Sequence, residues 1–156
     1  MSVPPDPPAT RTAPPPGVRA RLFKRQAVFG MSDGVAIILG LLVTLAGQPH
    51  ALFRAALGAS LAELVGMTAG QWLSDGESGF WAALTNGSAA CAACLIPALP
   101  ALAGGGIGAG VTAIVLVAAV AAVISWLRPE KGVLAVVQTY GILLTAAALC
   151  AAAGAV

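Results

Sequence analysis

The chain has 156 residues, of which 58% are apolar and 9% are charged, and its mean hydropathy is +0.90. This composition excludes a water-soluble domain and is typical of an integral membrane protein. The formal net charge of +2 comes mainly from the N-terminal segment, so lipid head groups match it better than nucleic acid does.

The N-terminal segment, which contains the runs PPDPP and APPPG, is rich in proline and cannot build a core. We therefore predict a disordered, basic, cytoplasmic tail over residues 1–24. The basic run RARLFKR at its end is expected at the membrane edge. Residues 25–156 are expected to form one transmembrane domain.

Five stretches are long and apolar enough to cross a bilayer as helices, which takes about 20 residues each. They lie near residues 27–46, 51–73, 81–102, 107–127 and 133–153. Their connections are short, so neighbouring helices are expected to run antiparallel. The predicted fold is an all-α membrane protein with five transmembrane helices.

The first span carries Asp33, about 12 Å from its basic end at roughly 1.5 Å of rise per residue. An ionisable group at lipid depth costs at least about 2.5 to 3.5 kcal/mol, so by default it faces the bundle interior and serves a function. Ser32, Asp33 and Gly34 are also typical helix-cap residues. A capping role for Asp33 stays open if the span begins later.

The second span carries Glu63, Met67 and Gly70 at i, i+4 and i+7, which places them on one helix face. Gly58 and Gly66 add small positions at which another backbone can approach. Glu63 lies about 16 Å and Met67 about 10 Å from the end of the span. Met67 fits a metal ligand beside Glu63 as well as it fits a gap-filling core residue.

The third span contains the pair Cys91 and Cys94, which we interpret as small apolar residues in preference to a redox or metal pair. The sequence LIPALP near its end predicts a bent or broken helix terminus, because proline removes a backbone hydrogen bond. Three glycines then predict a turn.

The fifth span carries Tyr140, about 14 Å from Lys131 and thus near the depth of Asp33 and Glu63. Two readings of Tyr140 are equally well supported: a residue of an ion path, or a bundle residue whose hydroxyl finds a buried acceptor. Gln71 and Gln138 are candidates for hydrogen bonds between helices.

Basic residues indicate which side of the membrane is cytoplasmic. With five spans, the basic residues before the first span and those after the fourth fall on one side, and Arg54 is left opposite. The N-terminus is therefore predicted to be cytoplasmic and the C-terminus external or lumenal. The residues on the cytoplasmic side are Arg11, Arg19, Arg21, Lys24, Arg25, Arg128 and Lys131.

Two carboxylates and a thioether favour a borderline first-row divalent metal, and Fe²⁺ or Mn²⁺ fits this set better than Ca²⁺. Partly desolvated carboxylates can also exchange a proton for the ion, which would couple transport to protons. No nucleophile with a positioned base is evident, so we expect neither an enzyme with catalytic residues nor a bound cofactor.

The order of four short motifs resembles the vacuolar iron transporter family of proton-coupled divalent-metal exporters. The motifs are FGMSDGVAI, LAELVGMTAGQWLSD, LIPALP and TYGI, and the resemblance covers roughly residues 25–150. It implies five helices per subunit and a homodimer with the ion path along the subunit interface. It also implies that Asp33, Glu63, Met67 and Tyr140 match functional positions of the family.

One departure from the family concerns the connection between the second and third spans. Typical members carry a long, glutamate-rich cytoplasmic domain there, whereas only SDGESGF is present here. The chain resembles the family's shorter, plant nodulin-like branch in this respect. Metal capture is expected to be weaker or differently controlled.

These observations together predict a homodimer that exports Fe²⁺ or Mn²⁺ from the cytoplasm in exchange for protons. Asp33, Glu63 and Met67 would bind the ion, and the path would also involve Tyr140, Gln138, Gly34 and Gly70. The host membrane would be the plasma (inner) membrane of a prokaryote or a vacuolar-type membrane. Two alternatives stay open: export of cobalt, nickel or zinc, and a non-transporting scaffold whose acids cross-link helices.

Overall fold

The structure is a computed structural model that describes residues 16–74, 79–128 and 132–154. Within these ranges the chain is helical and has no strand. The elements are α1 (Pro16–Thr44), α2 (Pro49–Ser74), α3 (Gly79–Ala98), the 3₁₀-helix η1 (Leu99–Ala103), α4 (Ile107–Leu127) and α5 (Val133–Gly154).

Four of the described helical segments are long and apolar enough to cross a membrane: α1, α2, α3 together with η1, and α4. In α5 the apolar stretch, Val136–Cys150, is shorter. The prediction of an all-helical fold is thus confirmed for the described residues, and four of the five predicted spans have the length and composition of membrane-crossing helices. The crossing by α5 stays a prediction.

The start of α1 differs from the expectation. The helix begins at Pro16 and not near residue 27, so the basic run RARLFKR forms its first turns and residues 16–24 are not an unstructured tail. The rest of the predicted tail, residues 1–15, lies outside the described residues. Asp33 is far inside α1, so the capping alternative for Asp33 is wrong.

The end of α3 matches the expectation from LIPALP. Pro97 is the last residue but one of α3, and the chain continues as the tighter helix η1 up to Ala103. Gly104 follows with a φ of 95°, a conformation that glycine adopts readily. The α-helix therefore tightens into a 3₁₀-helix at its end, and the chain then reverses direction through the glycines to begin α4.

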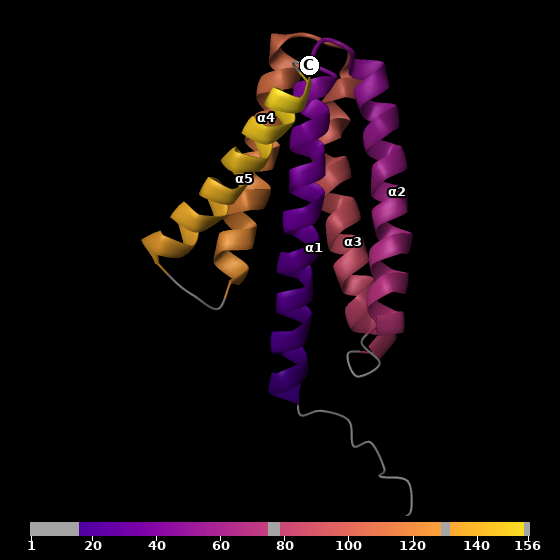
Figure 1. Cartoon of the computed structure of the whole chain (residues 1–156), viewed down its shortest axis with the longest axis vertical. Coiled ribbons are helices and arrows are strands. Elements are labelled where there is room, and N and C mark those ends of the chain that lie inside the picture. Colours follow the sequence, from indigo (N-terminus) through magenta and orange to yellow (C-terminus); the bar gives the residue numbers. More distant parts are fainter. Residues whose placement is uncertain (1–15, 75–78, 129–131, 155–156) are drawn as a thin grey trace, which may run out of the picture.

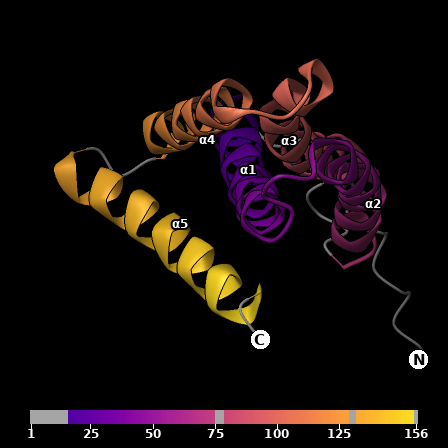
Figure 2. The ribbon, with the colours of Figure 1, turned by 90° about the horizontal axis from the view of Figure 1, so that it is seen from above.

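The three helices α1, α2 and α3 form the compact part of the bundle (Figures 1 and 2). Helix α3 packs closely against both α1 and α2, whereas α1 and α2 touch each other little. Helix α4 packs against α1 and α3. Helix α5 slants away from this group, and its main contacts are with α1 (Figure 2).

Glycines allow the close approach of α3 to its two neighbours. A Cβ at Gly30 or Gly34 of α1 would collide with the carbonyl oxygen of Asn86 or Ala90 in α3, respectively. A Cβ at Gly87 of α3 would collide with the Thr68 hydroxyl of α2. These three positions therefore bring the helix backbones into contact, as small residues do in membrane helices.

The glycines of α2 that were predicted to pack against another helix do not contact one within this chain. Nothing lies within 4 Å of a Cβ built at Gly58, Gly66 or Gly70, and all three residues are exposed. The predicted close-packing positions of α2 therefore lie on its outer surface within this single chain.

Substituting Gly34 by Ala is expected to destabilise the bundle, because the added methyl group has no room beside Ala90. Overpacking of this kind costs about 1–3 kcal/mol. Thermal unfolding in detergent micelles should show a lower midpoint. The control is Gly141→Ala on α5, where a Cβ meets nothing within 4 Å; equal effects of the two substitutions would contradict the packing described here.

Candidate cation site

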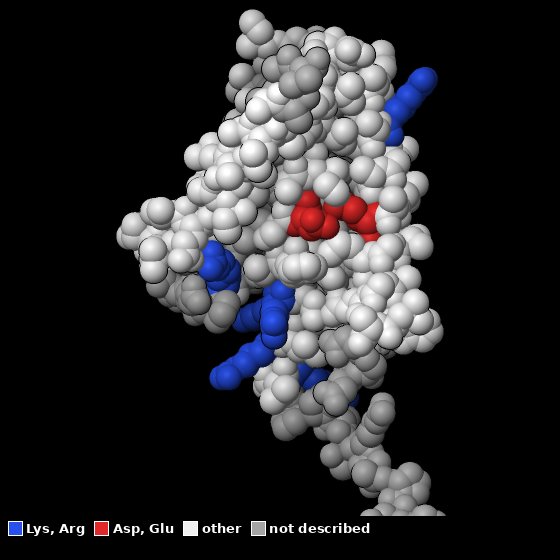
Figure 3. Space-filling model, in the orientation of Figure 1, with Lys and Arg blue, Asp and Glu red and all other residues white. Residues whose placement is uncertain are grey.

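The acidic pair lies midway along the bundle. Asp33 of α1 and Glu63 of α2 are the only acidic residues in the described ranges. Their side chains form a single patch in Figure 3, and they are near enough for the two charges to interact. Asp33 is exposed, whereas Glu63 is 7% exposed. The predicted meeting of these two residues is therefore present in the structure.

Glu63 has no hydrogen-bond partner for either of its carboxylate oxygens among the described residues, and both atoms are buried. A buried carboxylate without a partner is costly, above all at a depth where lipid supplies no hydrogen bonds. Glu63 therefore requires a proton, a cation or water beside it. This requirement is the clearest chemical signal in the structure.

Sulfur atoms border this acidic pair on the side of α3. Cys91 and Cys94 lie on α3 near Glu63, and the Cys94 thiol lies 3.9 Å from the carbonyl oxygen of Ala56 on α2. Cys94 is fully buried, as expected of a small apolar residue. Within the described ranges, no group of three or more His, Cys, Asp or Glu side chains is arranged to hold a metal ion.

Met67 lies between Glu63 and Gln71 on one face of α2, since the three residues are spaced four apart. This face is directed toward α3 at Gln71, because Gln71 Oε1 accepts a hydrogen bond of 2.7 Å from Asn86 Nδ2 on α3. Met67 itself is half-buried. Its position is consistent with a soft ligand one turn from Glu63.

Three buried polar residues near the acidic pair were not identified from the sequence: Ser60, Thr68 and Asn86. Thr68 Oγ1 and Asn86 Oδ1 are buried and have no partner in the described part of the chain, and the Ser60 hydroxyl is buried beside the Cys94 thiol. The signal for Asn86 was available, because an amide at lipid depth in an alanine-rich helix is as unusual as an acid. The hydroxyls gave no such signal, since Ser and Thr often bond to their own helix.

The structure does not bring Tyr140 and Gln138 to the acidic pair. The Tyr140 hydroxyl donates to the carbonyl oxygen of Ala118 in α4 at 3.1 Å. Gln138 Oε1 accepts from Arg128 at 3.0 Å. Both side chains are thus bonded to α4 or to the residue that follows it.

Gly34 and Gly70, the two glycines predicted to line the ion path, lie in different surroundings. Gly34 is buried against α3, next in sequence to Asp33, and is part of the helix packing. Gly70 is exposed on the outer surface of α2. Only Gly34 therefore lies next to the acidic pair.

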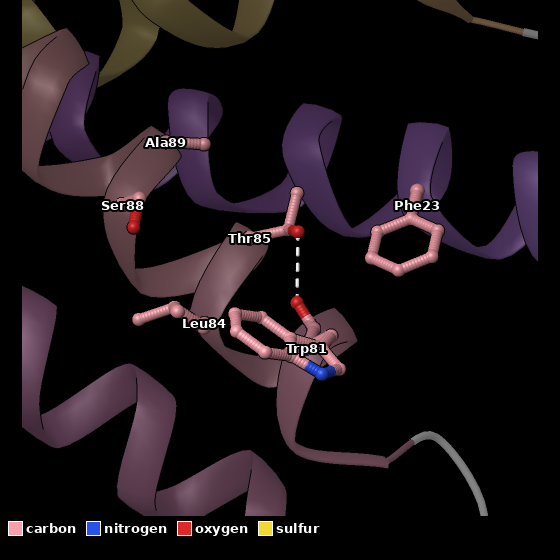
Figure 4. A pocket seen from close by; sticks show the side chains of 6 residues that line it. All are labelled: Phe23, Trp81, Leu84, Thr85, Ser88 and Ala89. Atoms are coloured by element: carbon pink, nitrogen blue, oxygen red, sulfur yellow. Dashed lines mark hydrogen bonds between the residues drawn. The ribbon is translucent and has the colours of Figure 1, made fainter.

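A hollow between α1 and α3 is not part of this site (Figure 4). Its lining residues are Phe23, Trp81, Leu84, Thr85, Ser88 and Ala89, and none of them is ionisable. The Thr85 hydroxyl donates to the carbonyl oxygen of Trp81 in its own helix at 2.8 Å. The hollow therefore offers an apolar surface that suits a lipid chain better than an ion.

Comparisons of the chain with protein-family models, with curated proteins and with solved structures find no match. The resemblance of its short motifs to the vacuolar iron transporters therefore stays a prediction, and the functional argument depends on the geometry of the acidic pair.

Because the buried Glu63 carboxylate has no hydrogen-bond partner among the described residues, replacing it with an apolar side chain is expected to stabilise the fold. Glu63→Met replaces it with an apolar side chain of similar length, and should raise the free energy of unfolding by about 1–3 kcal/mol, the cost of an unsatisfied buried polar group. Thermal unfolding in detergent without metal provides the measurement. Leu61→Met, on the exposed side of α2, is the control. A loss of stability in Glu63→Met would instead identify Glu63 as a structural cross-link.

Proposed function

We propose that the chain exports a divalent first-row metal, Fe²⁺ or Mn²⁺, from the cytoplasm in exchange for protons. The observation that carries this proposal is the meeting of Asp33 and Glu63, from two different helices, with both Glu63 oxygens buried and unpartnered. Carboxylate oxygens at lipid depth are characteristic of ion and proton pathways.

Charge balance supports exchange over simple binding. Two ionised carboxylates close together at low dielectric repel each other strongly. One divalent cation or two protons would neutralise them equally well. We therefore expect the pair to alternate between a metal-bound form and a doubly protonated form, which gives an exchange of one cation for two protons.

The chemistry of the neighbouring atoms supports a transition metal over Ca²⁺ or Mg²⁺. The Met67 sulfur would add a soft ligand to the two carboxylates, and the cysteine thiols lie at the edge of the same region. Soft sulfur ligands favour later metals. Cobalt, nickel and zinc thus stay as the alternative cargo.

The distribution of charged and aromatic residues supports a cytoplasmic N-terminus. Most of the basic side chains lie in the half of the molecule that contains the start of α1 and the end of α4 (Figure 3). At the connection of α2 and α3, Trp72, Phe80 and Trp81 pack edge to face, with ring centres 5.9 and 5.7 Å apart. Aromatic rings are typical of both membrane interfaces, and an excess of basic residues is typical of the cytoplasmic one, so the orientation follows from the basic residues.

A second copy of the chain would complete the site. Asp33 is exposed at the middle of the bundle, where contact with lipid would cost about 2.5–3.5 kcal/mol. The outward-facing glycines of α2 offer a surface on which another helix can pack closely. We therefore include a homodimer in the proposal, with the acidic pair covered at its interface.

A membrane scaffold is the rival from another functional class. In a scaffold, Asp33 and Glu63 would serve as hydrogen-bonded links between helices. The Glu63 oxygens have no such bond within the described residues, which favours the transporter.

Metal flux in proteoliposomes tests the proposal directly. Vesicles with an acidic interior should take up Mn²⁺ or Fe²⁺ in exchange for protons, and uptake should stop when the pH gradient is collapsed. Asp33→Asn, Glu63→Gln and Met67→Leu should each reduce the flux, the first two by more than roughly tenfold, since even outer-shell partners of a metal contribute that much.

Arg54→Gln, at the opposite end of the molecule from most basic residues, is the control for the flux measurement and should transport like the wild type. Folded, reconstituted protein that moves no divalent metal would support the scaffold. Equal flux in the wild type and in all three site variants would place the ion path elsewhere.

Cross-linking tests the homodimer. In a background without native cysteines, Gly66→Cys should form a disulfide between two copies under mild oxidation, because bridged residues need Cα atoms within about 7 Å. Ile114→Cys, on the exposed face of α4, is the matched control and should stay monomeric. Cross-linking at residue 114 and not at residue 66 would assign the interface to another face.

A further inference from the structure

The hollow between α1 and α3 is an elongated groove (Figure 4). Trp81, Thr85 and Ser88 of α3 line it at i, i+4 and i+7, so they share one helix face over about 10 Å. Phe23 of α1 lies toward the end of the groove that is opposite to Ser88. All four side chains are at least partly exposed. The groove is therefore open along its length and offers a mostly apolar surface to whatever surrounds the helices.

The packing of α1 on α3 gives the level of this groove. The contacts at Gly30 and Gly34 advance together along both helices, so α1 and α3 run in the same direction. At this register Trp81 lies near the level of Arg25, and Arg19 lies about 9 Å further toward the start of α1. Tryptophan side chains gather at the boundary between hydrocarbon and head groups. Arg19 is therefore expected at the level of the lipid head groups, just beyond the end of the groove.

Arg19 also lies on the correct face of α1. It precedes Phe23 by four residues, about one helical turn, so the two residues share the face that borders the groove. Arg21 is only two residues from Phe23 and lies on the opposite face of the same turn. Arg19 and Arg21 are both exposed. Of these two guanidinium groups, only that of Arg19 is thus placed at the open end of the groove.

The positive charge at the start of α1 has no counter-charge among the described residues. The acidic residues of the described ranges are Asp33 and Glu63, and Asp33 is about 21 Å further along α1 than Arg19. Figure 3 shows the acidic patch separate from the basic side chains. The exposed basic residues at this end are Arg19, Arg21, Lys24 and Arg25. An anionic group from outside the chain would complement them.

We propose that the groove binds an anionic phospholipid, with an acyl chain against Phe23, Trp81 and Thr85 and the phosphate group beside Arg19. A phospholipid joins an apolar chain to a phosphate group, as the groove joins an apolar surface to a guanidinium. Arginine matches phosphate through paired hydrogen bonds, and the neighbouring basic residues attract the net negative charge that a zwitterionic lipid lacks. This inference does not depend on the proposed metal transport, because the groove contains no residue of the acidic pair.

Quenching of Trp81 fluorescence by brominated lipid tests the proposal. The full-length chain has three tryptophans, so Trp72→Phe with Trp126→Phe leaves Trp81 alone. This protein is reconstituted in phosphatidylglycerol and phosphatidylcholine, with bromine on the acyl chains of one lipid or the other. Bromine quenches a tryptophan that it contacts, so the signal reports which lipid lies in the groove. The relative affinity should favour phosphatidylglycerol about fivefold, the effect of one basic residue near an anionic head group.

Two variants separate a defined site from general attraction to the basic end. Arg19→Gln should remove most of the preference for phosphatidylglycerol, whereas Arg21→Gln, which removes the same charge from the opposite face, should retain most of it. Ser88→Phe fills the groove and should also remove the preference. Val115→Phe, on the exposed side of α4, is the matched control and should not. A circular dichroism melt of each variant verifies that it is folded.

Several results would overturn the proposal. Equal affinity for the two lipids would show that the groove takes any acyl chain. Equal losses in Arg19→Gln and Arg21→Gln, or an unchanged preference in Ser88→Phe, would show that the charge acts without a defined site. Quenching by neither lipid would show that protein covers the groove, either a second copy or residues 1–15. Loss of the preference when inorganic phosphate is added would identify a site for free phosphate instead.

Discussion

Backbone contact at Gly30, Gly34 and Gly87 determines the arrangement around the acidic pair. Where a side chain would separate the helices, these glycines bring α1 and α2 against α3, so that Glu63 is enclosed on a face shared with Ser60 and Met67. Enclosure without a hydrogen-bond partner makes Glu63 unfavourable as an isolated anion. The packing that stabilises the bundle thus also encloses a carboxyl group that requires a proton, a cation or water beside it.

A site of this kind would suit the exchange of a cation for protons, because no group of the protein permanently neutralises its carboxylates. Asp33 is open at the surface, whereas Glu63 is enclosed. A cation would meet the open carboxylate of Asp33 before the enclosed carboxylate of Glu63. Protons, which compete for the same carboxylates, would release it.

The sequence allowed the helices and the acidic pair to be predicted, because long apolar runs and rare ionisable groups are strong local signals. Asn86 was missed although an amide in the middle of an apolar helix is itself an unusual local feature of the sequence. The glycines of α2 were expected to pack against a neighbour, but periodicity does not tell which face of a helix the rest of the chain covers. Counting residues from the ends of the spans predicted that Tyr140 lies at the depth of Asp33. That count assumed helix axes that run side by side, whereas α5 slants away from α1 to α3 and the Tyr140 hydroxyl bonds to α4.

The central claim is that Asp33 and Glu63 together hold one divalent cation, and a crystal structure of the protein grown with Mn²⁺ tests it most directly. Anomalous scattering locates manganese independently of the protein atoms. The account predicts an anomalous peak between the two carboxylates, within coordination distance of at least one oxygen from each. Carboxylates that point to lipid on separate faces, or manganese bound only at the basic end or outside the bundle, would contradict it.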